Sequence, residues 1–157
     1  MLKISRKASV LISLVLAYIC FGLVVLLAFC APGLLEHLIN LPDIIGDRES
    51  ITSVGKAAIL ALVYISLGIV ALADTLLIAL LYRVRSGLVF TSVSVALIRA
   101  ISWCAISLGA IFAVLSYYFT LAAIVAFAGI FLGLCLRVTK NAFEEATEIK
   151  AENDFTV

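Results

Sequence analysis

The sequence predicts an all-α integral membrane protein, a four-helix bundle in which each helix crosses the bilayer. Of its 157 residues, 65% are hydrophobic and only 13% are charged, which is too apolar for a surface that faces water. A helix needs about 20 apolar residues to span the hydrocarbon core, and the chain has enough for four such spans with connections. We therefore expect a single membrane domain, residues 1–157.

The first span is expected at residues 8–30. Pro32 and Gly33 follow it, and we expect them to end the helix because proline lacks an N–H group and glycine is flexible. Residues 34–39 can then form a short helix at the membrane interface. The whole segment from Leu34 to Ser53 is acidic, since a single arginine, Arg48, stands against Glu36, Asp43, Asp47 and Glu49.

The other three spans are expected at residues 54–82, 92–117 and 121–137. A basic loop with Arg83 and Arg85 separates the second span from the third. Because Lys and Arg accumulate in cytoplasmic loops, this loop and the basic N-terminus are both expected on the cytoplasmic side. An even number of spans separates the two basic clusters, so the two assignments agree. Both termini are then cytoplasmic.

Small residues predict how the last two spans pack. In lipid there is no hydrophobic drive between helices, so close backbone approach at small residues selects the partner face. Small residues recur every three or four positions, which places them on one face of each helix: Ser102, Ala105, Gly109, Ala113 and Ser116 on one span, and Ala122, Ala126, Gly129 and Gly133 on the other. We expect these two faces to pack within the chain. The alternative is a homodimer through the GxxxG motif at Gly129 and Gly133.

The last span is expected to continue into the cytoplasm as an amphipathic helix within the tail, residues 138–157. Its apolar side would carry Val138, Ala142, Phe143, Ala146 and Ile149. Acidic residues elsewhere on the helix oppose binding to an anionic lipid surface. We therefore expect the apolar side to meet protein.

Asp74 is the one acid inside the predicted spans, and Arg99 lies toward the inner end of the third span. A carboxylate at membrane depth costs about 2.5–3.5 kcal/mol on insertion scales, so Asp74 should face the bundle and find a partner. Thr75, Arg99 and Ser102 are the candidates. Asp74 is either a structural residue, as one of a buried pair or as a protonated acid that fixes the second and third spans, or a proton or cation site.

The sequence does not indicate an enzyme. No serine or cysteine has an evident base, and no glycine-rich phosphate loop occurs. The cysteines are scattered, and His37 cannot assemble a metal site by itself. We assign no catalytic residue, no metal ligand and no cofactor.

The basic loop is the centre of the expected partner-binding surface. Gly87 can adopt a positive φ and turn the chain back toward the membrane, and Phe90 can pack on the first turn of the next helix. We expect acids of the tail to contact Arg83 and Arg85, with Phe155 buried near Phe90. The residues assigned to this surface are Arg83, Arg85, Gly87, Phe90, Phe143, Glu152, Asn153, Asp154 and Phe155.

Two motifs carry a family resemblance. The loop Arg83-x-Arg85-Ser86-Gly87-Leu88-Val89-Phe90-Thr91 and the ending Glu152-Asn153-Asp154-Phe155-Thr156-Val157 resemble the bacterial membrane proteins catalogued as domain of unknown function 2975. Members look like four-span proteins with a similar middle loop and a tail of the type Glu-Asn-Asp-Leu-Thr-Val. Phe155 departs from the leucine that is frequent in that tail.

The resemblance implies a location in the bacterial cytoplasmic (inner) membrane. Genes of this family often lie beside a small helix-turn-helix regulator, which implies a non-enzymatic membrane protein that sequesters or modulates such a regulator. The chain itself is not expected to bind nucleic acid directly, since its net charge is only +1. The alternative function is a small transporter, channel or immunity-type membrane protein that uses Asp74.

Overall fold

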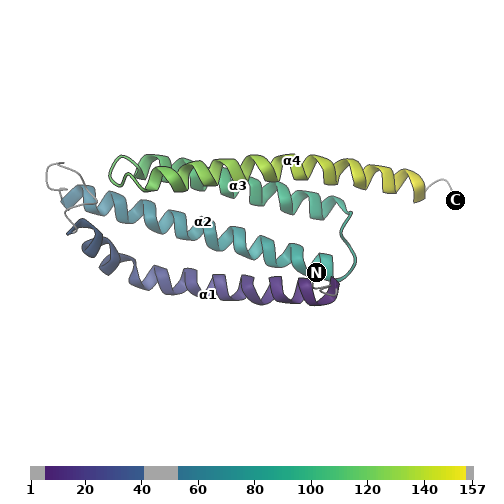
Figure 1. The fold of residues 1–157 in the computed structure, drawn as a ribbon, viewed down its shortest axis with the longest axis horizontal. Coiled ribbons are helices and arrows are strands. Elements are labelled where there is room, and N and C mark those ends of the chain that lie inside the picture. The colour runs from purple at the N-terminus through teal and green to yellow at the C-terminus, as the bar shows by residue number, and fades with distance from the viewer. Residues whose placement is uncertain (1–5, 41–52, 155–157) are drawn as a thin grey trace, which may run out of the picture.

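The computed structural model describes residues 6–40 and 53–154, which form four long helices (Figure 1). They are α1 (Arg6–Ile39), α2 (Ser53–Arg85), α3 (Ser92–Leu115) and α4 (Ala122–Asp154). Each helix is long and apolar enough to cross a membrane. The prediction of an all-α fold with four helices of membrane-spanning character is confirmed.

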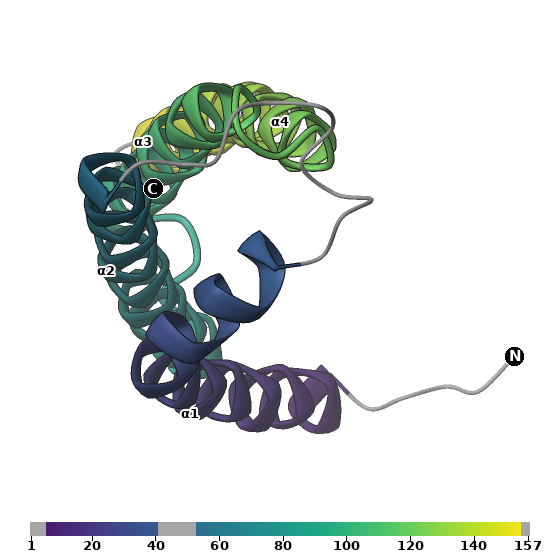
Figure 2. The ribbon, with the colours of Figure 1, turned by 90° about the vertical axis from the view of Figure 1, so that its left-hand side faces the viewer.

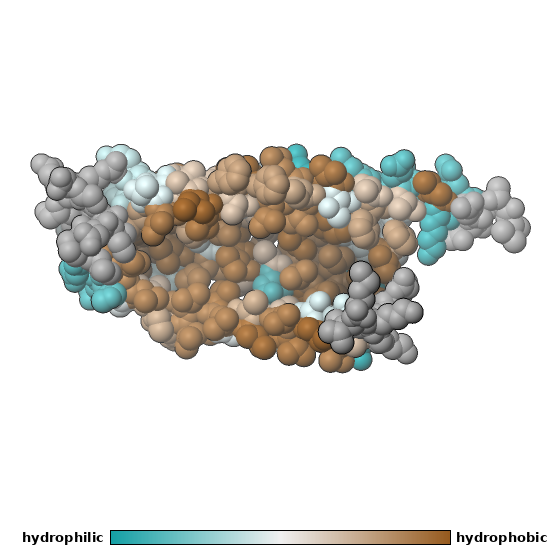
Figure 3. All heavy atoms as spheres, viewed as in Figure 1, coloured by the Kyte–Doolittle hydropathy of each residue, from teal (hydrophilic) through white to brown (hydrophobic). Residues whose placement is uncertain are grey.

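The outer surface of these helices is apolar. Figure 3 shows hydrophobic side chains across the middle of one face and hydrophilic ones mainly toward its two ends. On α1, for example, Leu16, Leu26 and Phe29 are 54%, 58% and 83% exposed. An apolar surface this extensive is a liability in water, whereas lipid tails solvate it without cost. The structure is that of a multi-pass membrane protein.

The four helices form an open bundle. Helices that are consecutive in the sequence pack side by side, α1 with α2, α2 with α3 and α3 with α4. Within the described ranges, the backbone of α1 does not come close to that of α3 or α4. Viewed along the helices, the bundle is an arc that is open on one side (Figure 2).

The expected end of the first helix before Pro32 is wrong. α1 runs through Pro32 and Gly33 to Ile39, so the predicted interfacial helix is the last part of α1. Ending a helix in lipid would expose backbone groups that nothing there can satisfy, so proline bends such a helix instead. Figure 2 shows the last turns of α1 swinging into the arc, where Leu35 joins a buried cluster with Ile59, Leu115 and Ala122.

The other helix boundaries lie close to the predicted ones, and α4 continues into the tail as a helix, as expected. α2 ends at Arg85 and α3 at Leu115, each within a turn of the expected position. α4 continues past Arg137 without a break to Asp154, and its C-terminal part projects beyond the other helices (Figure 1). The acidic loop residues Asp43, Asp47 and Glu49, with Arg48, lie outside the described residues, as do Lys3 and Phe155.

The helices α3 and α4 approach each other closely through their small residues. A Cβ atom added at Gly129 would lie 3.1 Å from Cα of Gly109, and one added at Gly133 would lie 3.1 Å from the backbone N of Ile106. The buried Ser102 donates from Oγ to the carbonyl O of Gly133 at 3.0 Å. The predicted packing within the chain is confirmed, and the GxxxG motif lies in this contact.

Gly109→Ala should destabilise the α3–α4 hairpin, because its Cβ would lie 2.8 Å from the backbone N of Ile130 and 2.9 Å from the carbonyl O of Ala126. Overpacking of this kind costs about 1–3 kcal/mol. The matched control is Gly68→Ala in α2, where an added Cβ meets nothing within 4 Å. In thermal unfolding of the detergent-purified protein, only Gly109→Ala should lower the melting temperature. Equal melting temperatures for the two variants would contradict the packing.

Candidate functional site

The loop between α2 and α3 begins with a well-defined helix end. Gly87 has a φ of 78°, as predicted. The backbone N of Leu88 donates to the carbonyl O of Arg83 at 2.9 Å, and the N of Gly87 donates to the carbonyl O of Val84 at 3.2 Å. These two bonds form a Schellman motif, which satisfies the last carbonyls of a helix when glycine takes the left-handed conformation. The direction in which the loop leaves α2 is thereby set.

The start of α3 is tied back to the same loop. Thr91 is the N-cap, and its Oγ1 accepts from the backbone N of Ser94 at 3.3 Å, the usual way in which a cap satisfies an unpaired helix donor. Ser94 is fully buried, and its Oγ donates to the carbonyl O of Leu88 at 3.0 Å. The hydroxyls of Thr91 and Ser94 lie 3.0 Å apart. Because Ser94 gives its proton to Leu88, Thr91 is the donor in that pair.

Arg83 belongs to this hydroxyl network. Its Nη2 donates to Oγ1 of Thr91 at 3.1 Å and its Nε donates to Oγ of Ser94 at 3.4 Å. Both acceptors are neutral oxygens at the start of α3. Arg83 therefore connects the last turn of α2 to the first turn of α3, a structural role that the sequence did not reveal.

Glu144 of α4 pairs with other cations than the predicted Arg83 and Arg85. Glu144 contacts Arg99 on α3 at 3.2 Å and Lys140 on its own helix at 2.5 Å. Neither Arg83 nor Arg85 forms an ion pair with an acid in the described part of the tail. The expected charge-assisted contacts of the two loop arginines are thus not observed there, because Arg83 reaches the nearer hydroxyls and Arg99 faces Glu144 across the α3–α4 hairpin.

An aromatic contact joins the loop to α4. The ring centroids of Phe90 and Phe143 lie 5.7 Å apart, with the planes tilted by 30°. This separation is typical of a favourable aromatic pair. Phe155, which was expected in this position, lies outside the described residues. Phe90 remains 44% exposed, so the pair still presents apolar area at the surface.

These elements together form a surface that we call the loop–helix surface, made of residues 83–91 and the α4 segment 138–154. α3 begins at Ser92, so the last turns of α4 have no antiparallel neighbour in the hairpin. Exposed side chains of those turns are Glu145, Glu148, Ile149, Lys150 and Glu152. Asn153 and Asp154 are in the same helix, so most of the predicted surface residues are at one end of the molecule.

Asp74 is buried without the partner that was expected. It is 8% exposed, and its Oδ2 has no hydrogen-bond partner among the described residues. Thr75 donates instead to the carbonyl O of Leu72 at 2.7 Å, Ser102 donates to Gly133, and Arg99 donates to Glu144. Each predicted partner is thus bonded elsewhere, and the expectation of a partnered Asp74 is wrong in the described structure.

Comparison with protein-family models, with curated proteins and with solved structures finds no match. The resemblance to domain of unknown function 2975 therefore stays a prediction that rests on the loop and tail motifs. In the part of the chain that the structure describes, no three metal-binding side chains lie together. Function has to be inferred from the loop–helix surface and from Asp74.

Ser94→Ala should loosen the α2–α3 loop, because it removes an acceptor of Arg83 and the donor to Leu88. The loss of these two hydrogen bonds should cost about 1–3 kcal/mol. Ser92→Ala is the matched control, since Ser92 is exposed in the same helical turn. Trypsin should cut after Arg83 and Arg85 faster in Ser94→Ala than in Ser92→Ala or the wild type. Equal cleavage rates in all three proteins would show that the network does not order the loop.

Proposed function

We propose that this is a non-enzymatic regulatory membrane protein that binds a small soluble protein through its loop–helix surface. The observation that carries the proposal is the continuation of α4 beyond its apolar segment. Past Glu144, which still contacts Arg99 of α3, the helix continues to Asp154 without a neighbour in the hairpin, about 15 Å at 1.5 Å per residue. A projecting helix of this length is marginally stable in water by itself, and a bound partner would stabilise it.

The arrangement of the helix ends supports a cytoplasmic position for this surface. The start of α1, the α2–α3 loop and the C-terminal end of α4 lie at the same end of the molecule (Figure 1). Arg6 at the start of α1 and the loop that follows Arg83 and Arg85 are at this end, which agrees with the positive-inside rule for a cytoplasmic face. We place the protein in a bacterial inner membrane with both termini in the cytoplasm.

The charge of the α4 segment indicates the chemistry of the partner. Its residues from 138 onward include five acids and two lysines, and Lys140 and Arg99 both pair with the same acid, Glu144. Such a surface favours a basic partner. DNA-binding proteins carry a basic surface for phosphate groups, so a small helix-turn-helix regulator fits this role. Acids of α4 that cover its basic surface would compete with DNA, and the regulator would be sequestered at the membrane.

Reversing one exposed charge on the α4 segment should test whether this segment binds the regulator, because the same reversal far from it should have no effect on binding. Glu148→Lys should weaken binding of the regulator about tenfold, because it places like charges opposite each other. Glu36→Lys makes the same change at the exposed far end of α1 and should leave binding intact. The measurement is the affinity of the purified regulator, identified by co-purification, for the detergent-solubilised variants, together with its release from operator DNA. Equal affinity for both variants, or unaltered DNA binding with the wild type, would refute the proposal.

The buried Oδ2 of Asp74, which has no hydrogen-bond partner in the part of the chain that the structure describes, favours a second candidate function, a small cation or proton transporter. Purified protein in liposomes should then carry a cation flux that is lost in Asp74→Asn, because the amide cannot exchange a proton or balance a cation. Asp154→Asn, which removes a carboxylate from the projecting end of α4, is the control and should keep the flux. Liposomes with wild-type protein that show no flux above empty liposomes would exclude this candidate.

A further inference from the structure

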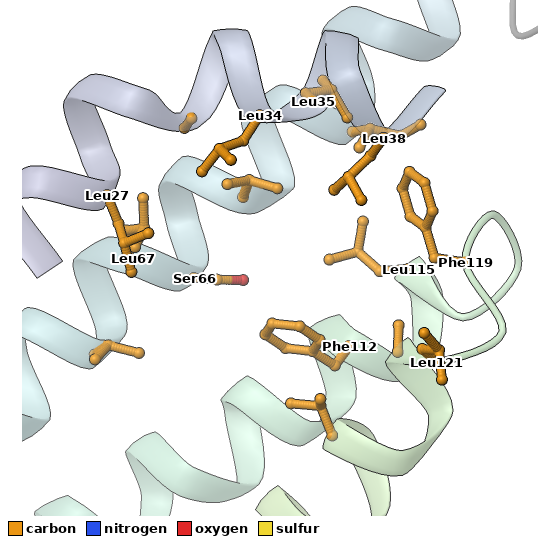
Figure 4. A pocket seen from close by; sticks show the side chains of 16 residues that line it. Leu27, Leu34, Leu35, Leu38, Ser66, Leu67, Phe112, Leu115, Phe119 and Leu121 are labelled. Carbon is orange, nitrogen blue, oxygen red and sulfur yellow. The ribbon is translucent and has the colours of Figure 1, made fainter. Parts of the chain in front are cut away.

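A cavity of about 400 Å³ lies inside the arc, beneath the bent end of α1. Figure 4 shows Leu35 and Leu38 of α1 on one side of it and Phe112 and Leu115 of α3 on the other. Its volume is within the range of pockets for small ligands. The polar side chain in the lining is Ser66, whose Oγ donates to the carbonyl O of its own helix at Leu62. The cavity therefore offers a ligand apolar contacts and little else.

The face of α2 that lines the cavity continues to Asp74. Ile59, Val63, Ser66 and Val70 line the cavity, and their spacing of three and four residues defines one face of the helix. Asp74 follows Val70 by four residues and lies on the same face, about 6 Å further along the helix axis. Its carboxyl group is buried, and its Oδ2 lacks a hydrogen-bond partner within residues 6–40 and 53–154. An apolar cavity is thus followed, one helical turn away, by a carboxyl group without a donor.

This combination selects one class of ligand. A carboxylate in apolar surroundings is costly unless a cation or donor lies beside it. A lipid acyl chain would fill the cavity but leave Asp74 without a partner, and an anionic amphiphile would add a second negative charge. A molecule with an apolar body and a terminal amine satisfies both parts at once.

We propose that the cavity and Asp74 form one binding site for a cationic amphiphile, an alkyl or arylalkyl amine whose body fills the cavity and whose ammonium group pairs with Asp74. The site is separate from the loop–helix surface and does not depend on a protein partner. It assigns a ligand class to the same carboxylate that the transport candidate uses. The test below measures ligand binding and not cation flux. A failure of the ligand-binding proposal is therefore distinguishable from a failure of the transport candidate.

Dodecylamine and dodecanol form a matched pair of probes, because they share the alkyl chain and differ in the charged end. Radiolabelled forms are equilibrated with the full-length chain in phosphatidylcholine nanodiscs, and binding to empty nanodiscs is subtracted. The wild type should bind the amine about tenfold or more tightly than the alcohol. Asp74→Asn should remove this difference while the alcohol still binds.

A second set of variants keeps Asp74 in place. Val63→Phe and Val70→Phe put a ring into the cavity and should weaken binding of both probes, which also covers the case that Asp74→Asn does not fold. Equal binding of amine and alcohol to the wild type would overturn the proposal and indicate that the cavity holds an acyl chain of the bilayer. Amine binding that survives both cavity-filling variants would likewise overturn it.

Discussion

Close packing of backbone against backbone between α3 and α4 is the contact on which the other parts of this structure depend. Lipid provides no hydrophobic drive for one helix to bind another, so contact area and short interhelical hydrogen bonds must do so. Gly109, Gly129 and Gly133 allow the two backbones to touch, and Ser102 adds a hydrogen bond across the contact. A side chain at any of these glycines would separate the helices.

The register of this hairpin also positions the loop–helix surface. Gly133 lies against the turn of α3 that contains Ser102 and Ile106. Because the two helices are antiparallel, the same register brings Phe143 of α4 beside Phe90 of the α2–α3 loop. Arg99 meets Glu144 along the same seam. Those contacts are exposed, and exposed ion pairs contribute little to stability, so they orient the α4 segment while the glycine packing holds the helices together.

The open arc has consequences at membrane depth. A closed bundle would cover the inner face of α2 with a third neighbour, whereas here that face lines a cavity and carries a buried carboxyl group at Asp74. The bend of α1 after Pro32 closes one end of the arc and creates the wall formed by Leu35 and Leu38. The proposed partner surface outside the membrane and the proposed ligand site within it thus lie in different parts of one fold.

Local patterns in the sequence determined the four apolar helices, the positive φ of Gly87 and the small-residue faces of α3 and α4. Each of these features follows from composition or from the helical repeat, and both depend on residues that are close together in the sequence. Only the tertiary structure decided that α1 passes through Pro32, that Arg83 binds hydroxyls and that Oδ2 of Asp74 has no hydrogen-bond partner among the described residues. These outcomes depend on which side chains from distant segments come within about 3 Å of each other. The order of residues along the chain does not give these distances.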